Sequence, residues 1–205
     1  MRDKRKFLSD LNELKQKLEE VYGNIKLDDI VDKLEYHYEL GLININHASI
    51  QLIVSAYLKS LGYRVFAEYE KKGRLLDIYA IGDVDIGIEV EYGYLPNPSA
   101  IIAEEYLMSR IALKILRYST LSSKFYIAVP SFYAPPLPKE LISSKDGEDA
   151  KKIIALIKRF HNINYIKVED FKNIKLNGII NVNVSELKVN IIDIEKYTLL
   201  KHSYG

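Results

Sequence analysis

Three carboxylates interrupt the two apolar, β-branched segments on either side of Asp83. If these segments are antiparallel strands with the turn centred on Asp83, Asp77 lies directly opposite Glu89, with Cβ atoms about 5 Å apart on a shared face. Glu91 follows two residues after Glu89, so its side chain is on the same face of the strand. Like charges at this spacing repel, and a divalent cation with oxygen ligands, Mg²⁺ or Mn²⁺, would offset the repulsion. The pattern predicts a metal site formed by Asp77, Glu89 and Glu91.

A second interpretation of the same carboxylates remains open. Charged side chains on the solvent face of a sheet protect it from aggregation, and Glu91 taken alone fits that role. Asp77 and Glu89 lie within apolar segments, where ionisable groups more often mark a functional site. We therefore favour a site for this pair.

The apolar periodicity predicts the elements that must position these residues. Helical spacing predicts helices within 7–23, 26–41, 46–62, 96–123 and 147–162, the fourth capped by Ser99. Strand patterns occur in 63–73, 75–82, 85–93, 124–132 and 164–168, and the tail 179–194 predicts a hairpin. This order predicts an α/β fold, a central mixed β-sheet flanked by helices. It also suggests an N-terminal helical extension (1–45), a core (46–170) and a C-terminal β extension (171–205).

The spacing of the acidic residues resembles a known motif. Asp77, eleven intervening residues and then Glu89-Val90-Glu91 are similar to the D...(D/E)-x-K signature of the PD-(D/E)xK nuclease superfamily. The similarity extends over about residues 46–130, where the predicted order of elements also matches. It implies a restriction-endonuclease-like core in which Asp77 and Glu89 bind Mg²⁺ or Mn²⁺, and it implies hydrolysis of phosphodiester bonds in DNA.

The sequence departs from that motif at two positions. Glu91 replaces the motif lysine, and Gln51 stands where the first helix of the family often has a glutamate. In some members the lysine has moved to the following helix, which here carries Arg110, Lys114 and Arg117 on one stripe. The resemblance implies that Lys114 or Arg110 supplies the displaced cation. Taken alone, the stripe also fits an ordinary solvated helix face.

Other side chains are candidates for supporting roles. Glu91 is expected to act as the third metal ligand or as a base that orients water. Arg74, Arg110 and Arg117 are expected to contact nucleic acid, with Lys71 and Lys72 near Arg74. Less specific candidates are Glu68 and Glu70 as extra ligands, His37 and His47 in surface or capping roles, and Tyr92, Tyr94, Phe132 and Tyr133 as stacking or packing aromatics.

Composition limits the possible classes of protein. The chain has 205 residues, 48% of them hydrophobic, and its 29 basic and 28 acidic side chains nearly cancel, so any nucleic-acid surface must be local. The absence of cysteine excludes disulfides and thiolate metal sites. Without an apolar segment of membrane-spanning length, a soluble, cytoplasmic protein is expected. Abundant Lys, Glu, Ile and Tyr are typical of proteins from hot-living organisms.

Together these features predict a metal-dependent DNA endonuclease-like protein, acting as a homodimer through its N-terminal helices. Two alternatives remain. The first is a nuclease-fold protein that has lost catalysis and serves as a nucleic-acid-binding or protein-interaction subunit. The second is a structural module in which the acidic cluster forms a salt bridge to Arg110.

Overall fold

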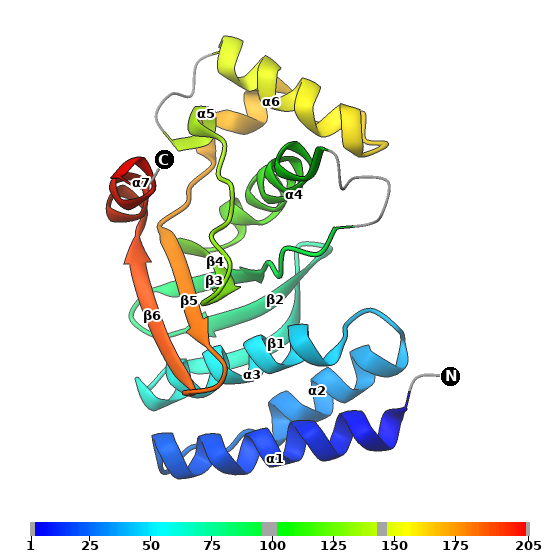
Figure 1. The fold of residues 1–205 in the computed structure, drawn as a ribbon, viewed down its shortest axis with the longest axis vertical. Coiled ribbons are helices and arrows are strands. Elements are labelled where there is room, and N and C mark those ends of the chain that lie inside the picture. The colour runs from blue at the N-terminus through cyan, green and yellow to red at the C-terminus, as the bar shows by residue number, and fades with distance from the viewer. Residues whose placement is uncertain (1–2, 96–101, 143–146, 204–205) are drawn as a thin grey trace.

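The computed structural model describes residues 3–95, 102–142 and 147–203. A six-stranded sheet with the order β1-β2-β3-β4-β5-β6 forms its centre, and helices cover both faces (Figure 1). The strands are β1 (Arg64–Lys71), β2 (Arg74–Ile81), β3 (Asp85–Val90), β4 (Lys124–Pro130), β5 (Gly178–Asn183) and β6 (Lys188–Asp193). Strands β1 to β3 form an antiparallel meander, β3 to β5 are parallel, and β6 is antiparallel to β5. The predicted α/β class with a mixed sheet is therefore confirmed.

Two helical layers enclose the sheet (Figure 1). On one face, α3 (Ile45–Ser60) packs with α1 (Lys4–Tyr22) and α2 (Asp28–Glu39); on the other lie α4 (Ala103–Tyr118) and α6 (Gly147–Phe160). Helix α3 lies between α1 and the sheet, which explains why it is apolar on nearly all sides, whereas the outer helices α1 and α6 are amphipathic. Each face of the sheet thus has its own hydrophobic core.

The register of the meander agrees with the turn predicted around Asp83. Ile81 pairs with Asp85 and Ile78 with Ile88. The next positions in this register are Asp77 and Glu89, but the backbone ladder ends just before them. The two carboxylates therefore lie opposite one another at the end of the β2–β3 pairing.

The C-terminal hairpin completes the sheet. Strand β5 pairs in parallel with β4, and β6 forms the outer edge. The strand predicted for 164–168 is wrong: residues 164–167 are irregular, and Val168 begins the 3₁₀-helix η3 (Val168–Asn173). Both edges of β4 are already paired, with β3 and β5, so no inner position is left for another strand.

The remaining shorter elements are η2 (Ser119–Leu121) and α5 (Lys139–Ile142), which lie between longer ones, and α7 (Ile194–Ser203), which follows β6. The predicted cap Ser99 lies outside the described residues. None of the helices in the described segments is both long and apolar enough to cross a membrane.

Candidate functional site

Asp77 and Glu89 replace backbone hydrogen bonds with side-chain ones at the end of the β2–β3 ladder. The Val90 N–H donates to Asp77 Oδ2 at 2.6 Å, and the Asp77 N–H donates to Glu89 Oε1 at 3.2 Å. Each carboxylate thus accepts from the opposite strand, which fixes the side-chain orientation of both. The sequence-based expectation that these two residues are cross-strand neighbours agrees with this geometry.

Lys114 joins the two carboxylates from helix α4. Its Nζ lies 3.5 Å from Glu89 Oε2 and 3.8 Å from Asp77 Oδ2, and it donates a hydrogen bond to the Val90 carbonyl. The apolar side of α4, including Ile111 and Ile115, is buried, and Lys114 lies at the margin of this side, from where it reaches the end of β3. The structure therefore brings together Asp77, Glu89 and Lys114.

Glu91 forms a separate pair with Arg110. Its side chain is fully buried, its Oε1 lies 3.1 Å from Arg110 Nη2, and the same oxygen accepts from the Gly93 N–H at 2.9 Å. Arg110 also donates to the Tyr94 carbonyl at 2.7 Å. This ion pair is the contact expected for the structural-module alternative, and it keeps the Glu91 carboxylate paired with Arg110.

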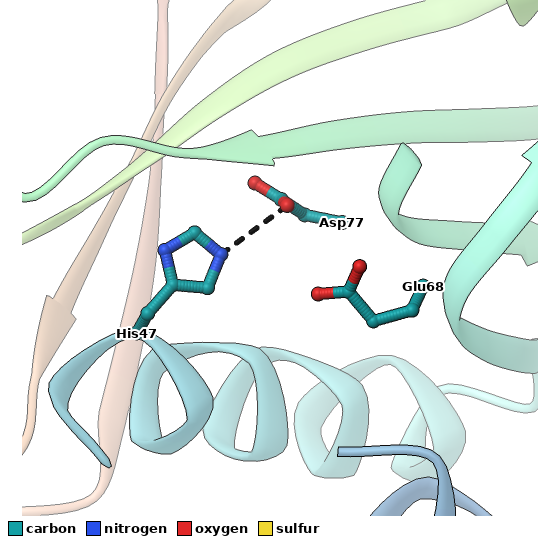
Figure 2. Close-up of side chains that lie close together, drawn as sticks. All are labelled: His47, Glu68 and Asp77. Atoms are coloured by element: carbon teal, nitrogen blue, oxygen red, sulfur yellow. Dashed lines mark ion pairs between the residues drawn. The ribbon is translucent and has the colours of Figure 1, made fainter. Parts of the chain in front are cut away.

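A histidine and a glutamate approach Asp77 from the opposite side. His47 Nε2 lies 3.2 Å from Asp77 Oδ1, and Figure 2 shows Glu68 turned toward the same space. One possible ligand atom from each of His47, Glu68 and Asp77 lies within 4.8 Å of the others. An imidazole and two carboxylates are a donor set that suits a divalent cation.

Two further side chains contact the Glu68 carboxylate. The Gln51 side-chain amide on α3 donates to Glu68 Oε1, and His37 Nδ1 on α2 lies 3.2 Å from Oε2. Glu68, Gln51 and His37 are all buried. Glu68 has a positive φ of 47°, an uncommon backbone conformation for a residue with a side chain.

Sequence reasoning missed the histidines of this site. His47 was expected in a surface or capping role, and Glu68 only as one of two optional ligands. Two signals point to them in retrospect: His47 and Gln51 are one helical turn apart, and the β1–β2 register places Glu68 opposite Asp77. His37 gives no such signal because its contact depends on how α2 packs.

Burial and charge shift the pKa values of the carboxylates in opposite directions. Burial, and then the nearby Asp77, raise the pKa of Glu68 to about 7, and the same two causes raise the pKa of Glu89. Burial would also raise the pKa of Asp77, but His47, Lys114 and the Val90 N–H outweigh it and lower the pKa to about 2. Asp77 is therefore the fixed anion of the cluster.

Lys114 is held as a cation by the same charges. Burial would lower the pKa of Lys114, but attraction to Asp77, Glu89 and then Glu91 outweighs this effect and raises it. Lys114 therefore carries a full positive charge beside the Asp77–Glu89 pair at neutral pH.

A polar groove leads away from Glu89 along α4. It consists of three adjoining surface cavities of about 270, 340 and 420 Å³. Arg117 and Tyr118 line both the first and the second cavity, and Arg74, Arg117 and Tyr165 line both the second and the third. Arg110, Lys114 and Arg117 line its first part, and Arg117 Nε donates to the Tyr165 hydroxyl at 2.7 Å. Arg74 lies on the β1–β2 side and donates to the Arg117 carbonyl. The three predicted nucleic-acid-binding arginines therefore line one continuous groove.

Comparisons with known proteins do not assign a family. No protein-family model, no curated protein and no solved structure matches the chain. The site is therefore interpreted from its own geometry.

Proposed function

We propose that the protein is a metal-dependent phosphodiester hydrolase that cuts DNA, built on a restriction-endonuclease-like core. The observation that carries the proposal is the convergence of Asp77, Glu89 and Lys114 at the end of the β2–β3 ladder. The order of α3, the meander, α4 and β4 supports the same core. Two carboxylates can hold a catalytic metal ion, and a lysine beside them can stabilise negative charge on a phosphate.

Each residue has a distinct role in this proposal. Asp77 and Glu89 would hold Mg²⁺ or Mn²⁺, which when bound supplies an activated water and charge stabilisation at the scissile phosphate. Lys114 replaces the lysine that is absent at the Glu91 position, and it offsets negative charge on the phosphate oxygens. Because Lys114 is hydrogen-bonded to the Val90 carbonyl, its ammonium stays close to the metal-binding carboxylates.

The groove along α4 supports DNA as the substrate. Arg117 and Arg74 lie beyond Lys114 in this groove and would bind successive phosphates of one strand. Tyr165 is 57% exposed beside Arg117 and offers an aromatic face to a base. The positive charge that would attract DNA is therefore local to this groove, in agreement with a chain whose basic and acidic side chains nearly cancel.

The proposal is tested by DNA cleavage with Mg²⁺ or Mn²⁺, using duplex, branched and single-stranded substrates. Wild type is expected to cut at least one of them, and both Asp77→Asn and Glu89→Gln are expected to lose at least about 100-fold in rate, within the range of single catalytic groups. Lys151→Ala, an exposed lysine on α6 paired with Glu148, is the control and should retain the wild-type rate. Full activity in both acidic-residue variants would overturn the assignment.

One observation favours a second function. Glu91 replaces the motif lysine and is paired with Arg110, as expected if the nuclease site had been converted into a binding site. An inactive, nucleic-acid-binding protein would bind DNA in a salt-dependent manner without metal-dependent cleavage. The cleavage assay distinguishes the two functions.

A further inference from the structure

We infer that His47, Glu68 and Asp77 form a binding site for a transition-metal ion of the Mn²⁺, Co²⁺ or Zn²⁺ class, separate from the Asp77–Glu89 side of the cluster. The site lies between α3, β1 and β2, as Figure 2 shows. Its contribution to catalysis rests on the proposed function, but binding of the ion can be measured without DNA.

The two oxygens of the Asp77 carboxylate have different surroundings. Oδ2 accepts from the Val90 N–H and faces the ammonium of Lys114, whereas Oδ1 faces only the His47 imidazole.

The Glu68 carboxylate forms no ion pair with a lysine or arginine among the described residues, and its single ion-pair contact there is His37. Glu68 and Asp77 therefore face one another without a lysine or arginine between them, and a buried carboxylate requires a positive partner when it is ionised.

Two buried polar atoms beside this site make no hydrogen bond to any of the described residues. They are His47 Nε2, which lies 3.2 Å from Asp77 Oδ1, and Gln51 Oε1, in a side chain whose amide nitrogen contacts Glu68. Buried polar atoms are nearly always satisfied, so each exception needs a cause. An ion between His47, Glu68 and Asp77 accounts for the His47 nitrogen directly and places Gln51 at the edge of the same site.

Two buried side chains fix the orientation of the Glu68 carboxylate. Gln51 and His37 each contact one of its two oxygens, which fixes the carboxylate in the way that outer-shell hydrogen bonds orient metal ligands. His37 comes from α2, so the N-terminal helices contribute a positioning residue as well as packing.

The donor atoms determine the class of ion. Metal–ligand distances of about 2.0–2.2 Å place ligand atoms at most about 4.4 Å apart, so the observed limit of 4.8 Å requires the side chains to move closer together. One imidazole and two carboxylates suit Mn²⁺, Co²⁺ or Zn²⁺, whereas Mg²⁺ prefers oxygen ligands and retained water.

Isothermal titration calorimetry with MnCl₂, ZnCl₂ and MgCl₂ tests the site. Wild type is expected to bind Mn²⁺ or Zn²⁺ with one tight site that millimolar Mg²⁺ does not displace. Glu68→Gln and His47→Gln should each weaken this binding more than about 10-fold, and His37→Gln about 10–100-fold. Glu70→Gln, two residues along β1 and exposed, is the matched control and should bind like wild type.

Glu89→Gln separates this site from the proposed catalytic one. It should retain the tight transition-metal site while losing DNA cleavage, with folding of every variant checked by thermal melting. Loss of tight binding in Glu89→Gln with wild-type binding in Glu68→Gln would overturn the inference, as would absence of tight binding in wild type. Tight binding without cleavage of any DNA would leave the metal site standing and remove the proposed hydrolase.

Discussion

His47 Nε2 and Asp77 Oδ1 lie 3.2 Å apart, although one residue is in the first turn of α3 and the other in β2. On the other side, Asp77 Oδ2 faces Lys114 of α4. Asp77 is therefore contacted by a side chain from each of the two helical layers. A change at this one position is expected to affect contacts with both layers.

The buried ion pair between Arg110 and Glu91 should contribute to stability, because Glu91 without Arg110 would be a buried carboxylate with no cation beside it. Arg110→Met is expected to lower the free energy of unfolding by about 2 kcal/mol or more, because it leaves a fully buried carboxylate without its cation. Urea unfolding measures this change. Adding Glu91→Gln to Arg110→Met should recover part of the loss, whereas an unchanged midpoint in Arg110→Met would show that the pair is not required.

Acid sensitivity should depend on Asp85. Burial would raise the pKa of Asp85, but hydrogen bonds from Ser123, Tyr79 and Lys71 outweigh this and hold it below its usual value. A lowered pKa in the folded state gives stability that is present above the unfolded pKa, about 3.9, and is lost as pH falls toward the folded value.

The corresponding variant is Asp85→Asn. At pH 7 it should be about 1 kcal/mol less stable, a modest value because the site is partly exposed. Thermal melting from pH 7 to pH 2 should show that the difference from wild type shrinks below pH 4. A difference that stays constant over this range would contradict the assignment.

The groove arginines should contribute to DNA affinity without reading sequence. Arg117→Ala is expected to weaken binding similarly for all DNA sequences and to reduce the salt slope of log K by about 1, as for the loss of one phosphate contact. Fluorescence anisotropy at several salt concentrations measures the slope. Lys151→Ala should leave it unchanged, and an equal slope for Arg117→Ala and wild type would remove Arg117 from the interface.

Local patterns in the sequence were sufficient for part of the site. The turn around Asp83 determines that Asp77 and Glu89 are opposite, and helical spacing places Lys114 on one stripe of α4 with Arg110 and Arg117. Both depend on short-range geometry, strand alternation and helical repeat, which a sequence displays directly.

The other contacts of the site, and the structure of residues 164–168, depend on packing between elements that are distant in the sequence. His37 reaches Glu68 only because α2 packs beside β1 and α3, and no periodicity in α2 indicates this. Glu91 was expected within the strand but follows directly after β3, and its pairing depends on where α4 places Arg110. Segment 164–168 has the composition of a strand, yet no inner edge of the sheet was free for it.

The most direct test of the proposed function is the single-turnover DNA cleavage rate of Lys114→Met, measured beside its DNA affinity. If Lys114 has replaced the motif lysine, the rate falls at least about 100-fold, DNA affinity changes little, and Lys114→Arg restores part of the rate because a cation returns to the same carboxylates. Cleavage by Lys114→Met at the wild-type rate would contradict the account, because the site would then work without the cation assigned to it.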